Sequence, residues 1–220
     1  MKTFTDLQEG VYDPNIFKAF FLAGGPGSGK SFVVRKTTGG LGMRVVNSDD
    51  IFEKLLDKEG LSKKMPASEK EPRDVVRQRA KELTAKKKAN FVEGRLGLII
   101  DGTGKDYDKI ARQATKLKQL GYDVHMIFVN TSLDVALERN AERPRSVQEP
   151  IVVKSWKSVQ SNIGKFSQYF RQNFVVVDNN DAGEDVFNKV FKQVMSLAKS
   201  GVQNNLGKQW IANELAKKRR

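Results

Sequence analysis

Short apolar runs alternate along the chain with longer segments in which apolar residues recur every three or four positions. The apolar runs, rich in β-branched and aromatic residues, predict strands at residues 17–23, 43–46, 96–100, 124–129 and 174–177. The longer segments predict helices at residues 30–36, 51–58, 74–92, 107–120, 132–141, 152–170 and 184–199. This alternation predicts an α/β fold in three layers, with helices on both faces of a mainly parallel five-stranded sheet.

Two segments do not fit this alternation. Residues 60–72 are polar and contain proline, which indicates a surface excursion rather than a linker between domains. Residues 201–207 read as a loop, and the last residues form a short amphipathic pattern with a basic end. We expect this C-terminal segment to dock on the domain, to bind a partner or to fray.

The composition limits the available chemistry. A chain of 220 residues is long enough for one domain with a real core. It contains no cysteine, which excludes a disulfide framework, a thiolate metal site and a cysteine nucleophile. Its only histidine, His125, lies in an apolar run, so we expect a packed strand residue rather than a catalytic group.

The charge indicates which partners to expect. The net charge of +13 favours polyanions such as nucleic acid, although the clusters at residues 86–88 and 217–220 have solvation of exposed faces as an alternative role. The first ten residues lack the apolar core of a secretion signal, and no run approaches the length of a membrane span. We therefore expect a cytoplasmic protein without a membrane partner.

The strongest chemical signal directly follows the first predicted strand. Residues 24–31 read GGPGSGKS and match GxxxxGK[ST], the pattern of a phosphate-binding loop between a buried strand and a helix. Glycines let backbone N–H groups point into one concavity, and the helix start adds its positive dipole end. Lys30 would reach the β- and γ-phosphates, and the Ser31 hydroxyl would bind nucleotide-bound Mg²⁺. The residues predicted to bind the nucleotide are Gly25, Pro26, Gly27, Ser28, Gly29, Lys30 and Ser31.

Acidic residues follow two other predicted strands, at the edge where open α/β sheets bind ligands. Asp101 ends an apolar run, and we interpret it as an acid that holds Mg²⁺ directly or through water, with a cap or turn as the alternative. Asp49 and Asp50 follow the second strand. The spacing of Asp50 and Glu53 predicts a capping box, which leaves Asp49 to accept the proton of an attacking hydroxyl. The reverse assignment of these two aspartates stays open.

Arginines gather at the end of the helix that follows the fourth strand. Arg139, Arg143 and Arg145 lie there, and Pro144 biases Arg143 away from helical geometry. We predict a lid near residues 139–150 that neutralises charge on a transferred phosphoryl group and excludes water. Surface arginines favoured by the helix dipole are the alternative.

These segments resemble the P-loop kinase group that includes phage-type polynucleotide 5′-hydroxyl kinases and zeta-toxin kinases. The resemblance covers about residues 17–170 and rests on GGPGSGKS, NSDD, IIDGTGKD and ALERNAERPRSV. It implies a P-loop NTPase fold with strand order 2-3-1-4-5, a kinase domain over residues 1–200, a helical tail over residues 201–220 and a phage origin. The roles that it implies are ATP and Mg²⁺ binding by Lys30 and Ser31, a general base at Asp49, a Walker-B-like acid at Asp101, and phosphate contacts from Arg139 and Arg143.

The chain departs from this group in two places. Polynucleotide kinases usually carry a basic residue soon after the base, where this chain has Ile51 and Phe52. Bifunctional members also have a phosphatase domain that opens with DxDGT, whereas Ile99 stands here at the first aspartate of that pattern. Phosphatase activity is therefore not expected.

Three hypotheses about function follow. The first is an ATP- and Mg²⁺-dependent kinase that phosphorylates a hydroxyl, with a polynucleotide 5′-end as the preferred acceptor because of the basic charge. The second keeps this chemistry but takes a sugar nucleotide, nucleoside or other small metabolite. The third is a nucleotide-dependent nucleic-acid-binding or assembly protein that transfers no phosphate. Asp49 and the arginine lid favour the kinases, because a simple switch requires neither.

Overall fold

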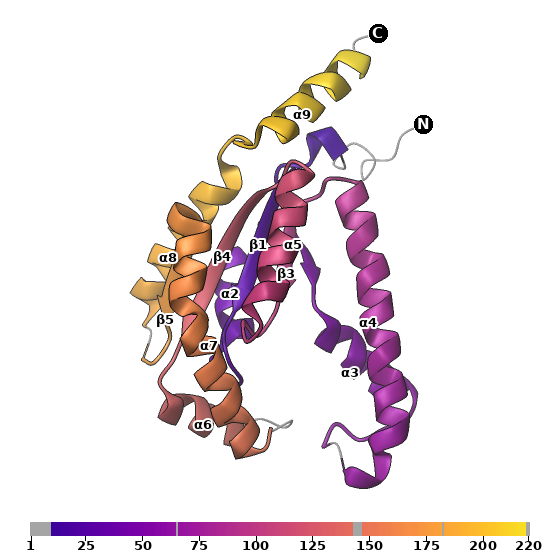
Figure 1. The fold of residues 1–220 in the computed structure, drawn as a ribbon, viewed down its shortest axis with the longest axis vertical. Coiled ribbons are helices and arrows are strands. Elements are labelled where there is room, and N and C mark those ends of the chain that lie inside the picture. Colours follow the sequence, from indigo (N-terminus) through magenta and orange to yellow (C-terminus); the bar gives the residue numbers. More distant parts are fainter. Residues whose placement is uncertain (1–9, 65, 143–146, 182, 219–220) are drawn as a thin grey trace.

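A computed structural model describes residues 10–64, 66–142, 147–181 and 183–218 (Figure 1). Over these residues, five strands form one parallel sheet in the order β2-β3-β1-β4-β5. The predicted fold class and strand order are therefore confirmed. The strands are β1 (Lys18–Ala23), β2 (Arg44–Val46), β3 (Leu98–Asp101), β4 (Asp123–Asn130) and β5 (Phe174–Asp178).

Helices connect the strands and follow the last one. They are α2 (Lys30–Thr38), α3 (Ser48–Lys58), α4 (Lys70–Glu93), α5 (Tyr107–Gln119), α6 (Leu133–Ala141), α7 (Glu149–Phe170), α8 (Glu184–Lys199) and α9 (Asn205–Lys218). Short 3-10 segments lie at Gly10–Tyr12, Ala67–Glu69 and Arg171–Asn173. Gly121 follows α5 with a φ of +101°, a conformation that glycine adopts at little cost, and the helix ends there.

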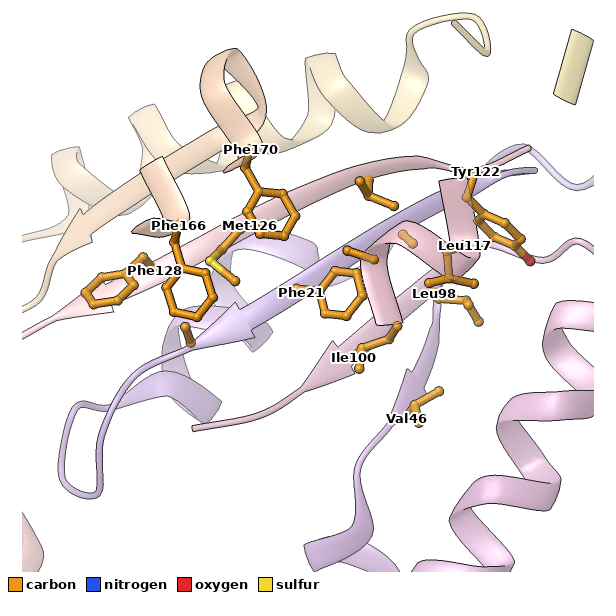
Figure 2. Packing of buried hydrophobic residues seen from close by; sticks show 14 of the residues in the cluster. Phe21, Val46, Leu98, Ile100, Leu117, Tyr122, Met126, Phe128, Phe166 and Phe170 are labelled. Atoms are coloured by element: carbon orange, nitrogen blue, oxygen red, sulfur yellow. The ribbon is translucent and has the colours of Figure 1, made fainter. Parts of the chain in front are cut away.

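Alternate side chains of β1 enter two different cores, which is why the sheet has a helical layer on each face. Phe20 and Leu22 belong to a cluster that includes residues of α2 and α8. Phe21 lies on the opposite face, in a cluster with Phe166 and Phe170 of α7 and residues of α5 (Figure 2). All six residues of β1 are buried, as expected for the central strand of a parallel sheet.

A third, smaller core joins α3 to α4 at one side of the molecule (Figure 1). Phe52 and Leu56 of α3 pack there against Val76 and Ala80 of α4. Residues 60–72, the predicted surface excursion, contain the Ala67–Glu69 turn and the first residues of α4, which begins at Lys70 rather than at the predicted residue 74. The α3–α4 pair therefore forms an arm next to the β2 edge of the sheet.

The C-terminal segment docks on the amino ends of the central strands. The buried Lys18 amine lies 2.8 Å from the Asp123 carboxylate, which also accepts hydrogen bonds from the backbone N–H groups of Gln203 and Asn204. Beyond this anchor, the Trp210 ring of α9 packs edge-on against Phe17, at 5.4 Å between ring centroids. Docking, one of the three expectations for this segment, is therefore observed.

His125 is the packed strand residue that its sequence context predicts. It lies in β4, is 3% exposed and stacks on the Phe20 ring at 4.7 Å between centroids. Burial, reinforced by the nearby Lys18 charge, lowers its pKa to about 4. The imidazole is therefore neutral near pH 7.

Among the described residues, no helix combines the length and apolar character needed to cross a bilayer.

Candidate functional site

The predicted phosphate-binding loop connects β1 to α2, and two of its glycines adopt conformations that other residues avoid. Gly27 has a φ of +77°, and a Cβ atom there would overlap the Ala136 carbonyl of α6. Gly29 has a φ of +74° and caps α2 without a side-chain hydrogen bond. The Phe32 and Val33 N–H groups donate to the Gly29 carbonyl. With no side-chain cap on α2, the N–H groups of Lys30 and Ser31 can donate to an anion.

Two neighbouring loops hold this segment in place. The buried Asn179, which follows β5, donates from Nδ2 to the Ser28 carbonyl at 2.8 Å. On the other side, the Gly24 N–H donates to the Thr103 carbonyl after β3 at 3.0 Å. Sequence reasoning missed the clamp by Asn179, because 151 positions separate it from Ser28 and no motif links the two.

The carboxyl ends of β1, β2 and β3 bring a lysine and two acids together. The Lys30 Nζ lies 3.3 Å from Asp101 Oδ1, and both side chains are mostly buried. The Asn47 amide donates from Nδ2 to Asp101 Oδ2 and to Asp50 Oδ1, each at 3.0 Å. Lys30, Asp101, Asn47 and Asp50 therefore form one continuous polar cluster.

The predicted capping of α3 by Asp50 is wrong, because Asn47 is the N-cap. Asn47 has extended backbone geometry, and its Oδ1 accepts the Asp49 N–H at 2.8 Å. The helix starts at Ser48 rather than at residue 51, so both aspartates lie in its first turn. Burial raises the pKa of the Asp50 carboxyl, and the charges of Asp101 and Glu53 raise it further. A raised pKa makes a carboxylate a better proton acceptor.

Asp49 contacts the second helix of the arm, α4. Its Oδ1 lies 3.6 Å from the Arg77 Nη1 of α4. The Arg77 guanidinium also stacks on the Phe52 ring, at 4.0 Å from the ring centroid. Sequence reasoning missed Arg77, because it lies in the middle of a charged helix and follows no strand.

The residues predicted to hold Mg²⁺ fit an oxygen-preferring cation. Asp101 Oδ1 is buried and, among the described residues, accepts no hydrogen bond; its ion-pair partner is Lys30. Ser31 lies in the first turn of α2, next to Lys30. Mg²⁺ prefers carboxylate, hydroxyl and phosphate oxygens and usually keeps several waters. The Asp101 carboxylate and the Ser31 hydroxyl, beside the predicted phosphate-binding loop, are therefore suitable Mg²⁺ ligands.

Arg139 contacts backbone carbonyl groups. Its Nη1 donates to the Asn179 carbonyl at 2.6 Å, and its Nη2 donates to the Asn180 carbonyl at 3.0 Å. It also lines a pocket of about 570 Å³ beside the loop. The other residues that line this pocket are Gly29, Phe32, Lys36, Asn179, Gly183, Glu184, Phe187 and Asn188.

The predicted arginine lid is only partly visible. Arg143 and Arg145 lie outside the described residues, so their roles and the lid stay predictions. Asn140 and Val147 lie on opposite sides of that gap in the sequence. The Asn140 side chain makes two hydrogen bonds with the Val147 backbone, at 2.7 and 3.0 Å. These bonds join the end of α6 to the residues that precede α7.

Comparison with known proteins gives one family and several similar folds. The zeta toxin family model matches residues 5–190. No curated protein sequence matches the chain significantly. A putative kinase from Chloroflexus aurantiacus j-10-fl has a TM-score of 0.54 at 16% identity, with 84% of this chain and 98% of that chain covered.

Two further solved structures share the fold over part of their length. The AvrRxo1-ORF1:-ORF2 complex with ATP has a TM-score of 0.58 at 15% identity, covering 79% of this chain and 63% of that chain. The Pnkp1/Rnl/Hen1 RNA repair complex has a TM-score of 0.54 at 17% identity, covering 69% of this chain and 47% of that chain. At such identities the likeness concerns the fold. These matches give no support to a phage origin.

Proposed function

Because this chain belongs to the zeta toxin family and has a P-loop kinase fold, we propose that it transfers the γ-phosphoryl group of ATP to a hydroxyl acceptor, with Mg²⁺ as cofactor. The observation that carries this proposal is the 3.3 Å contact between Lys30 and Asp101. It supports the proposal because the lysine of the phosphate-loop motif and an acid suited to Mg²⁺ meet at the carboxyl ends of the strands.

The nucleotide would lie across the loop, with its phosphates against residues 24–31 and its base in the pocket lined by Arg139. The loop amides and Lys30 would hold the β- and γ-phosphates, and Ser31 and Asp101 would hold Mg²⁺. Bound Mg²⁺ neutralises negative charge on the phosphates and on the transferred group. Phe32 and the fixed guanidinium of Arg139 offer flat surfaces against which a base can stack. The ATP complex among the similar folds supports the choice of nucleotide.

An aspartate in the first turn of α3 would accept the proton of the acceptor hydroxyl. As the proton leaves, a bond forms between the acceptor oxygen and the γ-phosphorus, and the bond from that phosphorus to the ADP oxygen breaks. Asp49 is the first candidate, because it is half exposed toward an incoming acceptor. Asp50 is the second, because its pKa is raised and Asn47 links it to Asp101.

We propose a polynucleotide 5′-hydroxyl as the acceptor. The net charge of +13 supports this choice, because a polyanion gains more from many lysines and arginines than a small metabolite does. A sugar nucleotide or other small metabolite is the alternative acceptor. A protein that binds nucleotide without transferring phosphate is the remaining possibility, and it predicts no labelled product.

Transfer of labelled γ-phosphate to a panel of acceptors tests this function. The panel holds 5′-hydroxyl DNA and RNA, a uridine-diphosphate amino sugar and nucleosides. We expect labelled 5′-ends, and labelling that weakens steeply as salt is added. Lys30→Ala should remove most of the activity. Loss of the general base should lower kcat by about 10²- to 10⁴-fold, so Asp49→Asn and Asp50→Asn are compared side by side.

The possible results distinguish which aspartate is the general base and which acceptor is used. A larger loss in Asp50→Asn than in Asp49→Asn would make Asp50 the base. Labelling of the amino sugar alone would select the small-metabolite acceptor. Wild-type labelling that Lys30→Ala and both aspartate variants leave unchanged would contradict the proposed mechanism.

A further inference from the structure

One side of α4 carries four basic residues, Lys70, Arg77, Lys81 and Lys88, and we call the last three the α4 basic stripe. At about 100° per residue, the stripe residues fall within about 40° of one another around the helix axis and span about 16 Å along it. Arg77 contacts α3 at one end of the stripe, and Lys88 donates to Gln113 of α5 at the other, at 3.0 Å. In Figure 1, α3 and α5 both lie on the inner side of α4. The stripe therefore faces the rest of the molecule.

Arg77 is oriented as an anion-binding group. Its guanidinium lies over the Phe52 ring, 4.0 Å from the centroid, and its side chain remains 36% exposed. A guanidinium has five N–H donors, and the 3.6 Å contact with Asp49 engages one edge of it. The other edge can donate two parallel hydrogen bonds to a phosphate. Arg77 thereby supplies a cation beside Asp49, where the sequence has the apolar residues Ile51 and Phe52.

Lys88 is a partly buried cation, and within the described parts of the chain no carboxylate pairs with it. Its hydrogen-bond partner is the neutral side chain of Gln113. Burial lowers the pKa of its amine, and the charge of Lys109 at the start of α5 lowers it further. Holding the partly buried Lys88 amine near the charge of the exposed Lys109 costs stability, and an arriving anion would relieve that cost.

We propose that the α4 basic stripe, together with Lys109, binds successive phosphate groups of the acceptor while the acceptor hydroxyl lies at Asp49. This inference rests on the proposed kinase function and deepens it. A single phosphate group reaches only one end of a stripe about 16 Å long. The acceptor class that fits the whole stripe is a polymer with a phosphate at every repeat.

Charge removal on the two sides of α4 tests the stripe. Arg77→Gln and Lys88→Gln remove charges from it, whereas Arg79→Gln and Lys86→Gln remove equal charges about 180° to 200° around the axis from Arg77. Arg79 pairs there with Glu59, the residue that follows α3, at 3.8 Å. The measurements are kcat and KM for a 5′-hydroxyl oligonucleotide and KM for ATP, each at several salt concentrations.

We expect each stripe variant to raise the oligonucleotide KM by about 10-fold, the range of a charge-assisted hydrogen bond to phosphate. The slope of log KM against log salt should fall by about one, while KM for ATP stays unchanged. The two control variants should change the oligonucleotide KM less than two-fold. Arg77→Lys, which keeps the charge but loses the planar fork, should give an intermediate KM.

Two results would overturn the stripe while leaving the kinase intact. One is an oligonucleotide KM that responds equally in stripe and control variants. The other is a fall in kcat without a rise in KM, since that pattern would make Arg77 a positioning residue for Asp49. If the wild type labels no acceptor at all, the proposed function fails instead. Oligonucleotide affinity by fluorescence anisotropy in the same variants then tests the stripe alone, with equal affinity in all of them as the contradicting result.

Discussion

At the scale of single residues, Asn47 organises the acids of the candidate site through one side chain. Its oxygen caps α3, and its amide nitrogen contacts both Asp50 and Asp101. A carboxylate held by such a contact keeps one orientation, which a metal-binding or proton-accepting group requires. The positions of Asp50 and Asp101 thus depend on contacts with an uncharged side chain.

Acid sensitivity is a further property of a single residue, His125. Its pKa is about 4 in the folded protein and near 6.5 when unfolded, so the unfolded state binds more protons between these values. The stability that neutral His125 contributes is complete above pH 6.5 and falls as the pH drops towards 4. We expect a loss of about 3 kcal/mol over this window. Denaturant unfolding at several pH values measures it.

His125→Phe is the matched variant for this prediction, because a phenyl ring retains the stacking on Phe20 and does not titrate. The difference in unfolding free energy between wild type and variant should shift in favour of the variant as the pH falls from 7 to 4.5. The titration of other groups is common to both proteins and cancels. Parallel pH profiles would show that the imidazole does not control acid stability.

Some residues of the candidate site could be identified from the sequence, and others could not. Lys30 and Asp101 could be identified because each follows a strand and belongs to a recognisable motif, and the structure brings them together. Asn179 could be recognised only as a base contact or a turn residue after the fifth strand. Its contact with Ser28, and the role of Arg77, could not be predicted, since they depend on how the loop after β5 and α4 pack. The cap at Asn47 was missed because Asp50 and Glu53 also satisfy a capping pattern one turn later.

At the scale of elements, α9 stabilises the end of the sheet opposite the candidate site. Gly207 of α9 approaches Gly121 so closely that a Cβ on either would collide with the other backbone. Trp210 contacts Phe17, and the Arg95 guanidinium lies 6.0 Å from the Phe17 centroid and 5.9 Å from the Trp210 centroid. The helix is thus held by close packing and by an aromatic and cationic cluster.

Truncation of Trp210 tests this role of α9. Trp210→Ala should lower the unfolding free energy by about 2 kcal/mol, less than the loss for a fully buried ring because Trp210 is only partly buried. Leu206→Ala on the same helix should cost under about 0.5 kcal/mol, since Leu206 is 53% exposed. Denaturant unfolding gives both values. Equal losses, or a Trp210 loss below 0.5 kcal/mol, would mean that α9 is not a stabilising part of the domain.

Element types could be predicted more securely than their order and limits. Each strand was visible as an apolar run, because strands of a parallel sheet are covered on both faces. The order of the strands came from the resemblance to P-loop kinases, since periodicity carries no information about which strands pair. The start of α4 was missed because the residues from Lys70 to Arg73 are polar and include a proline.

At the scale of the whole molecule, the carboxyl ends and the amino ends of the strands have different roles. The carboxyl ends of the strands carry the loop, Lys30 and the acids, and the amino ends carry Lys18, Asp123 and α9. Parallel strands impose this separation, because every loop at one edge follows a strand and every loop at the other precedes one. The central claim is that the carboxyl edge binds ATP with Mg²⁺ between β1 and α2.

Equilibrium binding of MgATP, measured by isothermal titration calorimetry, tests that claim most directly. We predict one bound nucleotide per chain, with an affinity that falls about 10- to 100-fold in Lys30→Ala because a charge-assisted contact to phosphate is lost. Arg35→Ala removes an exposed charge from the same helix and should leave the affinity unchanged. Absence of binding to the wild type, or equal affinity in wild type and Lys30→Ala, would contradict the account.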